Sequence, residues 1–119
     1  MGADLNYVKN KKKKFLAMSD VDGGYYRDCY NSFGTFAGLG LSWWQDVIPM
    51  LDKGVLSVEK AEELKKMVED KLSYFEMRAK PDMQIYQEVY AKNIIEDSKI
   101  LIAFLDNAIK LGIKIDCSL

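Results

Sequence analysis

The stretch of the chain that differs most from the rest is residues 23–46, GGYYRDCYNSFGTFAGLGLSWWQD. It holds both tryptophans, seven of the fourteen aromatic residues and five of the eight glycines, with few charges. Glycine is retained where the chain must bend or let another group approach closely. Large aromatic side chains beside it can build a core, a pocket wall or an interface anchor. We therefore look for function in this segment, although its composition does not name one.

The length and composition of the chain indicate one globular domain that spans residues 1–119. The chain has 49% hydrophobic and 29% charged residues and only two prolines, which is typical of a folded protein. No apolar run approaches the roughly 20 residues that cross a bilayer. Lysines at 9 and 11–14 interrupt any secretory signal. We therefore expect a cytoplasmic protein that does not contact a membrane.

Histidine is absent, and this removes several kinds of chemistry. The commonest general base and most zinc and Ser-His sites depend on it. Cys29 and Cys117 match no CxxC pattern, and in a reducing compartment they are expected to be thiols, with a disulfide between them left open. We predict no cofactor, no metal site and no enzymatic activity.

Charge is unevenly distributed along the chain. Residues 1–18 carry five lysines against Asp4, a net charge of +4, and residues 19–119 carry 12 basic and 17 acidic residues, a net of −5. An acidic body disfavours nucleic-acid binding, which relies on neutralising phosphates. We interpret the lysine run as a solvated helix or loop, and contact with RNA, an anionic surface or an acidic partner is the alternative.

The apolar pattern predicts a mainly α-helical fold, an all-α domain apart from its ends. Short helices are expected at 9–18 and 25–33, and a third should begin at Trp43 with Ser42 as its cap. A long helix should follow Ser57, with a buried stripe of Ala61, Leu64, Val68, Leu72 and Phe75.

After a break at Pro81, the last helix is expected over 82–111, with Gly112 as its stop. The frame is therefore two long C-terminal helices. Residues 2–8 and 113–117 read as strands, and we expect them to pair the termini in a short two-stranded sheet.

The sequence Asp20-Val-Asp-Gly23 has the outline of a phosphotransferase motif, in which one carboxylate attacks phosphorus and the other handles a proton beside a metal ion. That chemistry needs a parallel sheet and further motifs downstream, which this chain lacks. We interpret these residues as a turn. A metal-dependent hydrolase that uses Asp20 and Asp22 is the third functional hypothesis.

The residues that follow combine aromatic faces with polar groups. On a helix, Tyr26 and Tyr30 share a face, as do Arg27 and Asn31, and such a set could hold a base, a phosphate or a carboxylate. The alternative is internal: an ion pair of Arg27 with Asp28 or Asp46, beneath buried tyrosines.

The tryptophan pair suggests two different environments. Trp43 and Trp44 point about 100° apart on a helix, so one should fill the core and the other should lie exposed or line a groove. An exposed tryptophan near Asp46 would be a candidate interface hot spot.

Four segments of the chain resemble a family of small uncharacterised bacterial and phage proteins. They are Gly2-Ala-Asp-Leu5, Gly24-Tyr-Tyr-Arg-Asp-Cys-Tyr-Asn31, Leu39-Gly-Leu-Ser-Trp-Trp-Gln-Asp-Val47 and Ile115-Asp-Cys-Ser-Leu119. These segments cover about a third of the chain, and the stretch before Gly24 is shorter than in the family. The resemblance carries no activity, and it implies a phage or prophage setting in which small acidic proteins bind a host protein.

The leading hypothesis is a non-enzymatic protein-interaction module, a phage or prophage modulator of a host or defence factor. A small-ligand binder for a nucleotide-like molecule, which would use Arg27 and the aromatics, is the alternative. The partner is expected to be another protein, and self-association is left open. The candidate binding residues are Tyr26, Arg27, Tyr30, Asn31, Trp43, Trp44 and Asp46.

Overall fold

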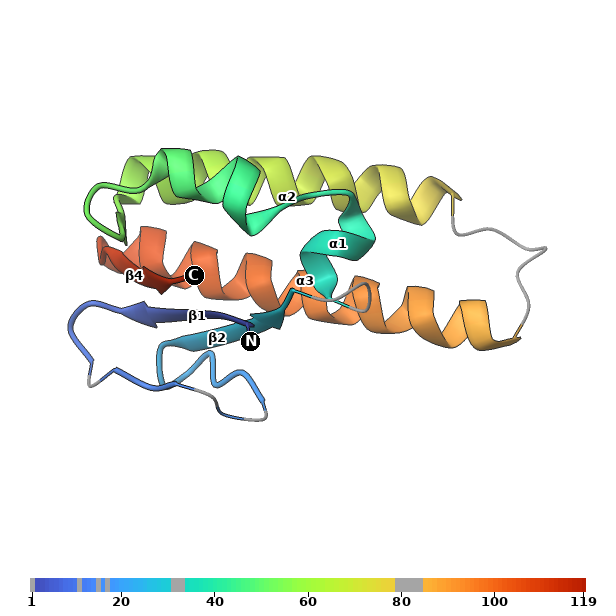
Figure 1. Ribbon diagram of the computed structural model, residues 1–119, viewed down its shortest axis with the longest axis horizontal. Coiled ribbons are helices and arrows are strands. Elements are labelled where there is room, and N and C mark those ends of the chain that lie inside the picture. Colours follow the sequence, from blue (N-terminus) through green and yellow to red (C-terminus); the bar gives the residue numbers. More distant parts are fainter. Residues whose placement is uncertain (1, 11, 15, 17, 31–33, 79–84) are drawn as a thin grey trace.

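The computed structural model describes residues 2–10, 12–14, 16, 18–30, 34–78 and 85–119, with only the backbone of 85–88. It is a four-stranded antiparallel sheet with helices packed on one face (Figure 1). The elements are β1 (Gly2–Tyr7), β2 (Tyr25–Cys29), α1 (Thr35–Leu39), η1 (Trp43–Val47), η2 (Ile48–Met50), β3 (Val55–Leu56), α2 (Val58–Arg78), α3 (Ile85–Leu111) and β4 (Ile115–Ser118).

The predicted mainly α-helical, all-α fold is wrong. Helices make up 56% of the chain, but a four-stranded sheet makes up another 19%, so the class is mixed α and β. The strand order is β2-β1-β4-β3. The expected pairing of the two termini is present, since β1 pairs with β4, but it is one part of a larger sheet. The sequence prediction missed β2 and β3.

The predicted helix over 25–33 is replaced by β2 where the structure describes it. Tyr25 and Tyr26 are both fully buried, so neighbouring residues on opposite faces of β2 are covered. The strand therefore lacks the apolar–polar alternation that marks a half-exposed strand. Its two tyrosines suit a pleated sheet, and pairing with β1 decides the structure.

Gly2 allows β1 and β2 to meet closely. It lies opposite Cys29, and a Cβ atom there would be 2.4 Å from the backbone oxygen of Asp28 and 3.0 Å from Nη2 of Arg27. The opening Gly-Ala-Asp-Leu segment and the Tyr-Tyr-Arg-Asp segment therefore pack against each other as paired strands.

The helical face of the sheet holds the hydrophobic core. Tyr7 of β1 stacks on Phe104 of α3 with ring centroids 4.7 Å apart, and its hydroxyl donates to the Phe104 carbonyl at 2.7 Å. In Figure 1, α2 and α3 run side by side over this face. The predicted stripe on α2 is confirmed at the buried positions Ala61, Leu64, Val68 and Leu72. Its last member, Phe75, is half-buried and packs against the edge of the core.

The ends of the long helices agree with the sequence signals. The Lys60 amide donates to Oγ of Ser57 at 3.2 Å, which caps α2. Gly112 has a φ of +64° and follows α3, where an L-residue would be strained. The predicted break at Pro81 and the first residues of 82–111 lie outside the described residues. No helix in the described part of the chain is both long and apolar enough to cross a membrane.

The described residues of 8–24 lie on the side of the strands away from the helices (Figure 1). Asn6 holds the segment, because its amide bonds the backbone N–H and C=O of Lys13, each at 2.8 Å. Lys12 pairs with Asp116 at 3.1 Å and Lys13 with Asp20 at 2.9 Å. The described residues of 9–18 form no helix, and two lysines of the run, Lys12 and Lys13, pair with acidic groups of their own chain.

The two cysteines cannot join in this fold. Cys29 is on β2 and Cys117 on β4, and β1 lies between these strands. Two strand spacings amount to about 10 Å, whereas bridged cysteines have Cα atoms within about 7 Å. Cys117 is buried, and burial raises the pKa of its thiol from 9.0 to about 12.

We predict that a maleimide reagent at neutral pH labels Cys29 and leaves Cys117 unmodified until the protein is unfolded, because only Cys29 is partly exposed. Mass spectrometry of the digested protein measures both sites. Equal labelling rates in the native protein would contradict the placement of β4.

The buried thiol also predicts a pH dependence. Above pH 9 the unfolded chain loses the Cys117 proton while the folded chain keeps it up to about pH 12, so stability falls as pH rises through this window. The slope from this group approaches about 1.4 kcal/mol per pH unit. Urea unfolding of wild type and Cys117→Ala at pH 8 to 10.5 should show a shallower decline for the variant. Parallel declines would contradict the assignment.

Candidate functional site

The carboxylate of Asp28 organises the segment that follows β2. This side chain is 5% exposed and accepts four hydrogen bonds. Oδ1 accepts from the amides of Cys29 and Thr35 at 2.9 and 2.8 Å. Oδ2 accepts from the Phe36 amide at 3.1 Å and from Nε1 of Trp43 at 2.7 Å. Burial raises the pKa of Asp28, and the hydrogen bond from Trp43 is the largest opposing effect.

Trp43 is a core residue. Its ring stacks on Phe36 with centroids 3.7 Å apart and an interplanar angle of 4°. It begins η1, and Ser42 caps this turn, as the sequence predicted, by accepting from the Gln45 amide at 3.2 Å. Asp46 completes a reciprocal cap, since its Oδ2 accepts a hydrogen bond from the Ser42 amide at 2.7 Å. Trp43 and Asp46 therefore hold the segment in place.

Tyr26 is also internal. It is fully buried on the helical face of the sheet, and its hydroxyl donates to Oδ2 of Asp97 on α3 at 2.5 Å. The Thr35 hydroxyl donates to the same oxygen. Burial raises the pKa of Tyr26 well above its ordinary value, so this phenol stays a donor.

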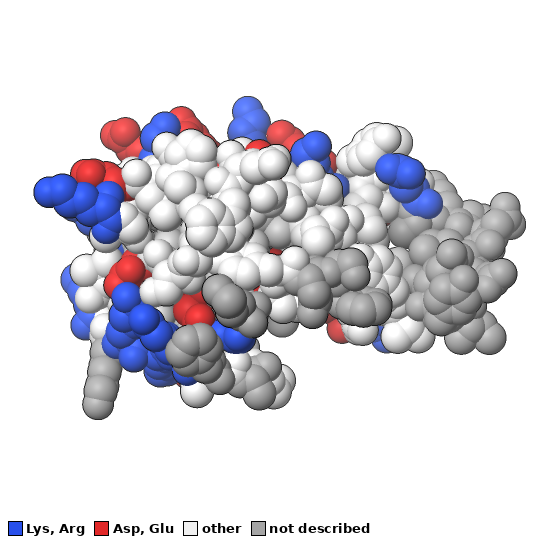
Figure 2. All heavy atoms as spheres, in the orientation of Figure 1, with Lys and Arg blue, Asp and Glu red and all other residues white. Residues whose placement is uncertain are grey.

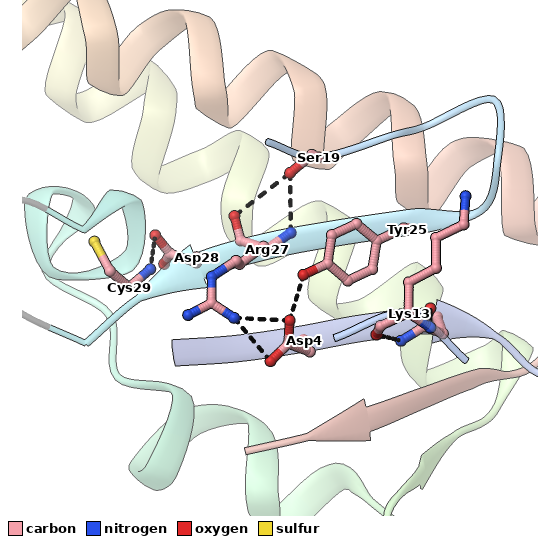
Figure 3. A network of polar contacts seen from close by, with 8 residues as sticks. Asp4, Lys13, Ser19, Tyr25, Arg27, Asp28 and Cys29 are labelled. Carbon is pink, nitrogen blue, oxygen red and sulfur yellow. Dashed lines mark hydrogen bonds and ion pairs between the residues drawn. The ribbon is translucent and has the colours of Figure 1, made fainter. Parts of the chain in front are cut away.

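Arg27 points to the opposite face of the sheet. Its Nη1 donates to both oxygens of Asp4, at 2.9 and 3.0 Å, and the Tyr25 hydroxyl donates to the same carboxylate (Figure 3). The predicted pairing with Asp28 or Asp46 is therefore wrong, although the ion pair is internal. Because Tyr26 and Arg27 lie on a strand, the helical faces that the sequence suggested do not exist.

Tyr30 and Trp44 are the two predicted site residues that meet at the surface. Their ring centroids are 6.4 Å apart, and Trp44 is 57% exposed while Tyr30 is half-buried. Asn31 lies outside the described residues. Beside these rings is a hollow of about 240 Å³, here called the aromatic hollow, which is lined by Cys29, Tyr30, Phe36, Ala37, Leu41, Ser42, Trp43 and Trp44.

A second hollow of about 280 Å³, here called the polar hollow, lies next to it. It is lined by Arg27, Asp28, Cys29, Thr35, Asn93, Ile94 and Asp97. Cys29 lines both hollows, so they adjoin each other. One is mainly aromatic and the other carries two carboxylates.

The surface around the aromatic hollow is poor in charge. Residues 34–50 carry a single charged side chain, Asp46, which is used to cap η1. In Figure 2 the middle of the face shown is uncharged, and charged atoms gather along its upper edge and lower left. A neutral face with an exposed tryptophan is typical of a binding surface.

The Asp20–Gly23 segment is a turn, as predicted. The Gly23 amide donates to Oδ1 of Asp20 at 3.0 Å, and the hydrogen bond from Lys13 lowers the pKa of that carboxyl. Within the ranges given above, no group of three or more cysteine, aspartate or glutamate side chains could hold a metal ion.

Sequence reasoning missed Asp4, Thr35 and Asp97. Asp4 gives a weak signal, because it stands between Ala3 and Leu5 in a strand. Asp97 gives none, since it is one of many acidic residues in the chain and meets Tyr26 across 71 positions.

No protein-family model, curated protein or solved structure matches the chain.

We predict that Asp28→Ala lowers the free energy of unfolding by at least about 3 kcal/mol, because it leaves buried donors unsatisfied. Asp28→Asn, which keeps one acceptor oxygen, should cost less. The matched change Asp46→Ala removes only a capping bond, worth about 1 kcal/mol. Urea unfolding measures all three, and equal losses for Asp28→Ala and Asp46→Ala would contradict the role of Asp28.

Proposed function

We propose that the protein is a binding module that recognises another protein through the neutral face around Trp44. The observation that carries this proposal is the 57% exposed indole of Trp44 beside the aromatic hollow. An exposed indole beside an apolar hollow, on a surface that is poor in charge, has the composition of a protein-binding surface. Tryptophan and tyrosine are also the residues that most often dominate the free energy of protein binding.

The size of the aromatic hollow favours a protein partner over a nucleotide. Pockets for small molecules and cofactors measure about 300–1,000 Å³, and this hollow measures about 240 Å³. It suits one large apolar side chain of a partner. The nucleotide hypothesis also needs Arg27 to bind an anion. Its guanidinium is paired with Asp4, and the hollow that Arg27 lines also carries Asp28 and Asp97, whose charges disfavour an anion.

Hydrolysis through Asp20 and Asp22 has little support from the geometry. Asp20 bonds Gly23 and Lys13 within a turn, and its backbone pairs with Tyr25 at the start of β2. The identity of the partner as a host or defence factor stays a prediction of the family resemblance.

The test compares the wild type with two single variants, each of which replaces one exposed aromatic residue with alanine. We expect Trp44→Ala to lose at least tenfold in affinity for a protein captured from a bacterial lysate, which corresponds to about 1.4 kcal/mol. Tyr74→Ala is the matched control, because Tyr74 is 59% exposed on α2 and lines neither hollow. Affinity is measured by titration of the isolated partner.

The expected pattern is a partner retained by wild type and Tyr74→Ala and lost by Trp44→Ala. Equal binding of that partner by all three proteins would overturn the proposal. Unfolding curves of the variants confirm that both remain folded, as expected for changes at exposed side chains.

A further inference from the structure

We infer that the segment bound at Trp44 carries a basic side chain next to its apolar anchor, and that Asp97 in the polar hollow pairs with it. This inference rests on the proposed function and names the chemistry of the partner. The two hollows adjoin at Cys29, so one short peptide segment can reach both.

The carboxylate of Asp97 has a fixed orientation at the wall of the polar hollow. Tyr26 and Thr35 both donate to its Oδ2, which fixes the orientation of the carboxylate. Neither bond uses Oδ1, and the side chain is only half-buried at the wall of the polar hollow. A carboxylate that is already oriented loses little conformational entropy when a donor binds.

The charges that line the polar hollow favour a cation. Asp28 accepts four internal hydrogen bonds, so it contributes negative charge and has no lone pair to spare. The guanidinium of Arg27 is paired with Asp4, and the carboxylates of Asp28 and Asp97 therefore leave the hollow negative. Lys92 is a basic residue on the same helix as Asp97, but it does not line the hollow, and its Nζ lies 4.0 Å from Oε1 of Glu96.

Arginine suits this place better than lysine. Its planar guanidinium can pair with a carboxylate while it stacks on an aromatic ring. Asp97 offers the carboxylate, and Tyr30 and Trp44 offer the rings in the adjoining aromatic hollow. An apolar anchor and an arginine close together would complement both hollows.

The probe is a displayed library of random linear peptides selected on the full-length chain. We expect the selected peptides to combine a large apolar residue with an arginine or lysine. For the tightest synthetic peptide, Asp97→Asn should lower the affinity about tenfold and flatten its dependence on salt, because the substitution keeps the shape and removes the charge. Asp70→Asn on α2 is the matched control and should bind as the wild type does.

Replacing the basic residue of the peptide with glutamine gives the second arm. The wild type should lose about tenfold in affinity for this peptide, and Asp97→Asn should bind both peptides equally, which shows that the two charges act on each other.

The outcomes separate the two proposals. Peptides that depend on Trp44 but lack a basic residue, or that bind Asp97→Asn as tightly as wild type, would overturn the pairing and leave the binding face intact. Peptides that bind Trp44→Ala as tightly as wild type would overturn the proposed function itself.

Discussion

The structure depends on one buried carboxylate. Asp28 receives hydrogen bonds from its own strand, from the first turn of α1 and from the indole of Trp43. A buried acceptor with four donors fixes the position of each donor, because leaving any of them unpaired would cost about 1–3 kcal/mol. Through these bonds β2, α1 and η1 form one unit. The same bonds place Trp43 against Phe36 and leave its neighbour Trp44 at the surface.

Much of the helical frame could be predicted from local sequence. Ser57, Gly112 and the apolar stripe of α2 mark the helices through short-range effects, namely capping, backbone conformation and 3.6-residue periodicity. The strand β2 could not be predicted this way. Its residues are covered on one face by helices and on the other by described residues of 8–24, so its sequence shows no alternation of apolar and polar residues. Only its pairing with β1, about twenty positions away, reveals it.

The candidate site was also predictable only where local helical geometry decides it. Two adjacent tryptophans on a helical turn must face different surroundings, and this held for Trp43 and Trp44. The expected grouping of Tyr26 and Arg27 with them assumed a helix. On a strand, these two side chains lie on opposite faces, where Asp97 and Asp4 hold them. Those partners come from distant parts of the chain, and composition does not single them out.

The central claim is that Trp43 belongs to the Asp28 network and that its neighbour Trp44 stays exposed beside the aromatic hollow. Hydrogen exchange of the two indole Nε1–H groups, followed by NMR and assigned with Trp43→Phe and Trp44→Phe, tests it most directly. We expect the Trp43 indole to be strongly protected, since it donates to a buried carboxylate, and the Trp44 indole to exchange rapidly. Equal exchange of the two groups, or protection of Trp44 alone, would contradict it.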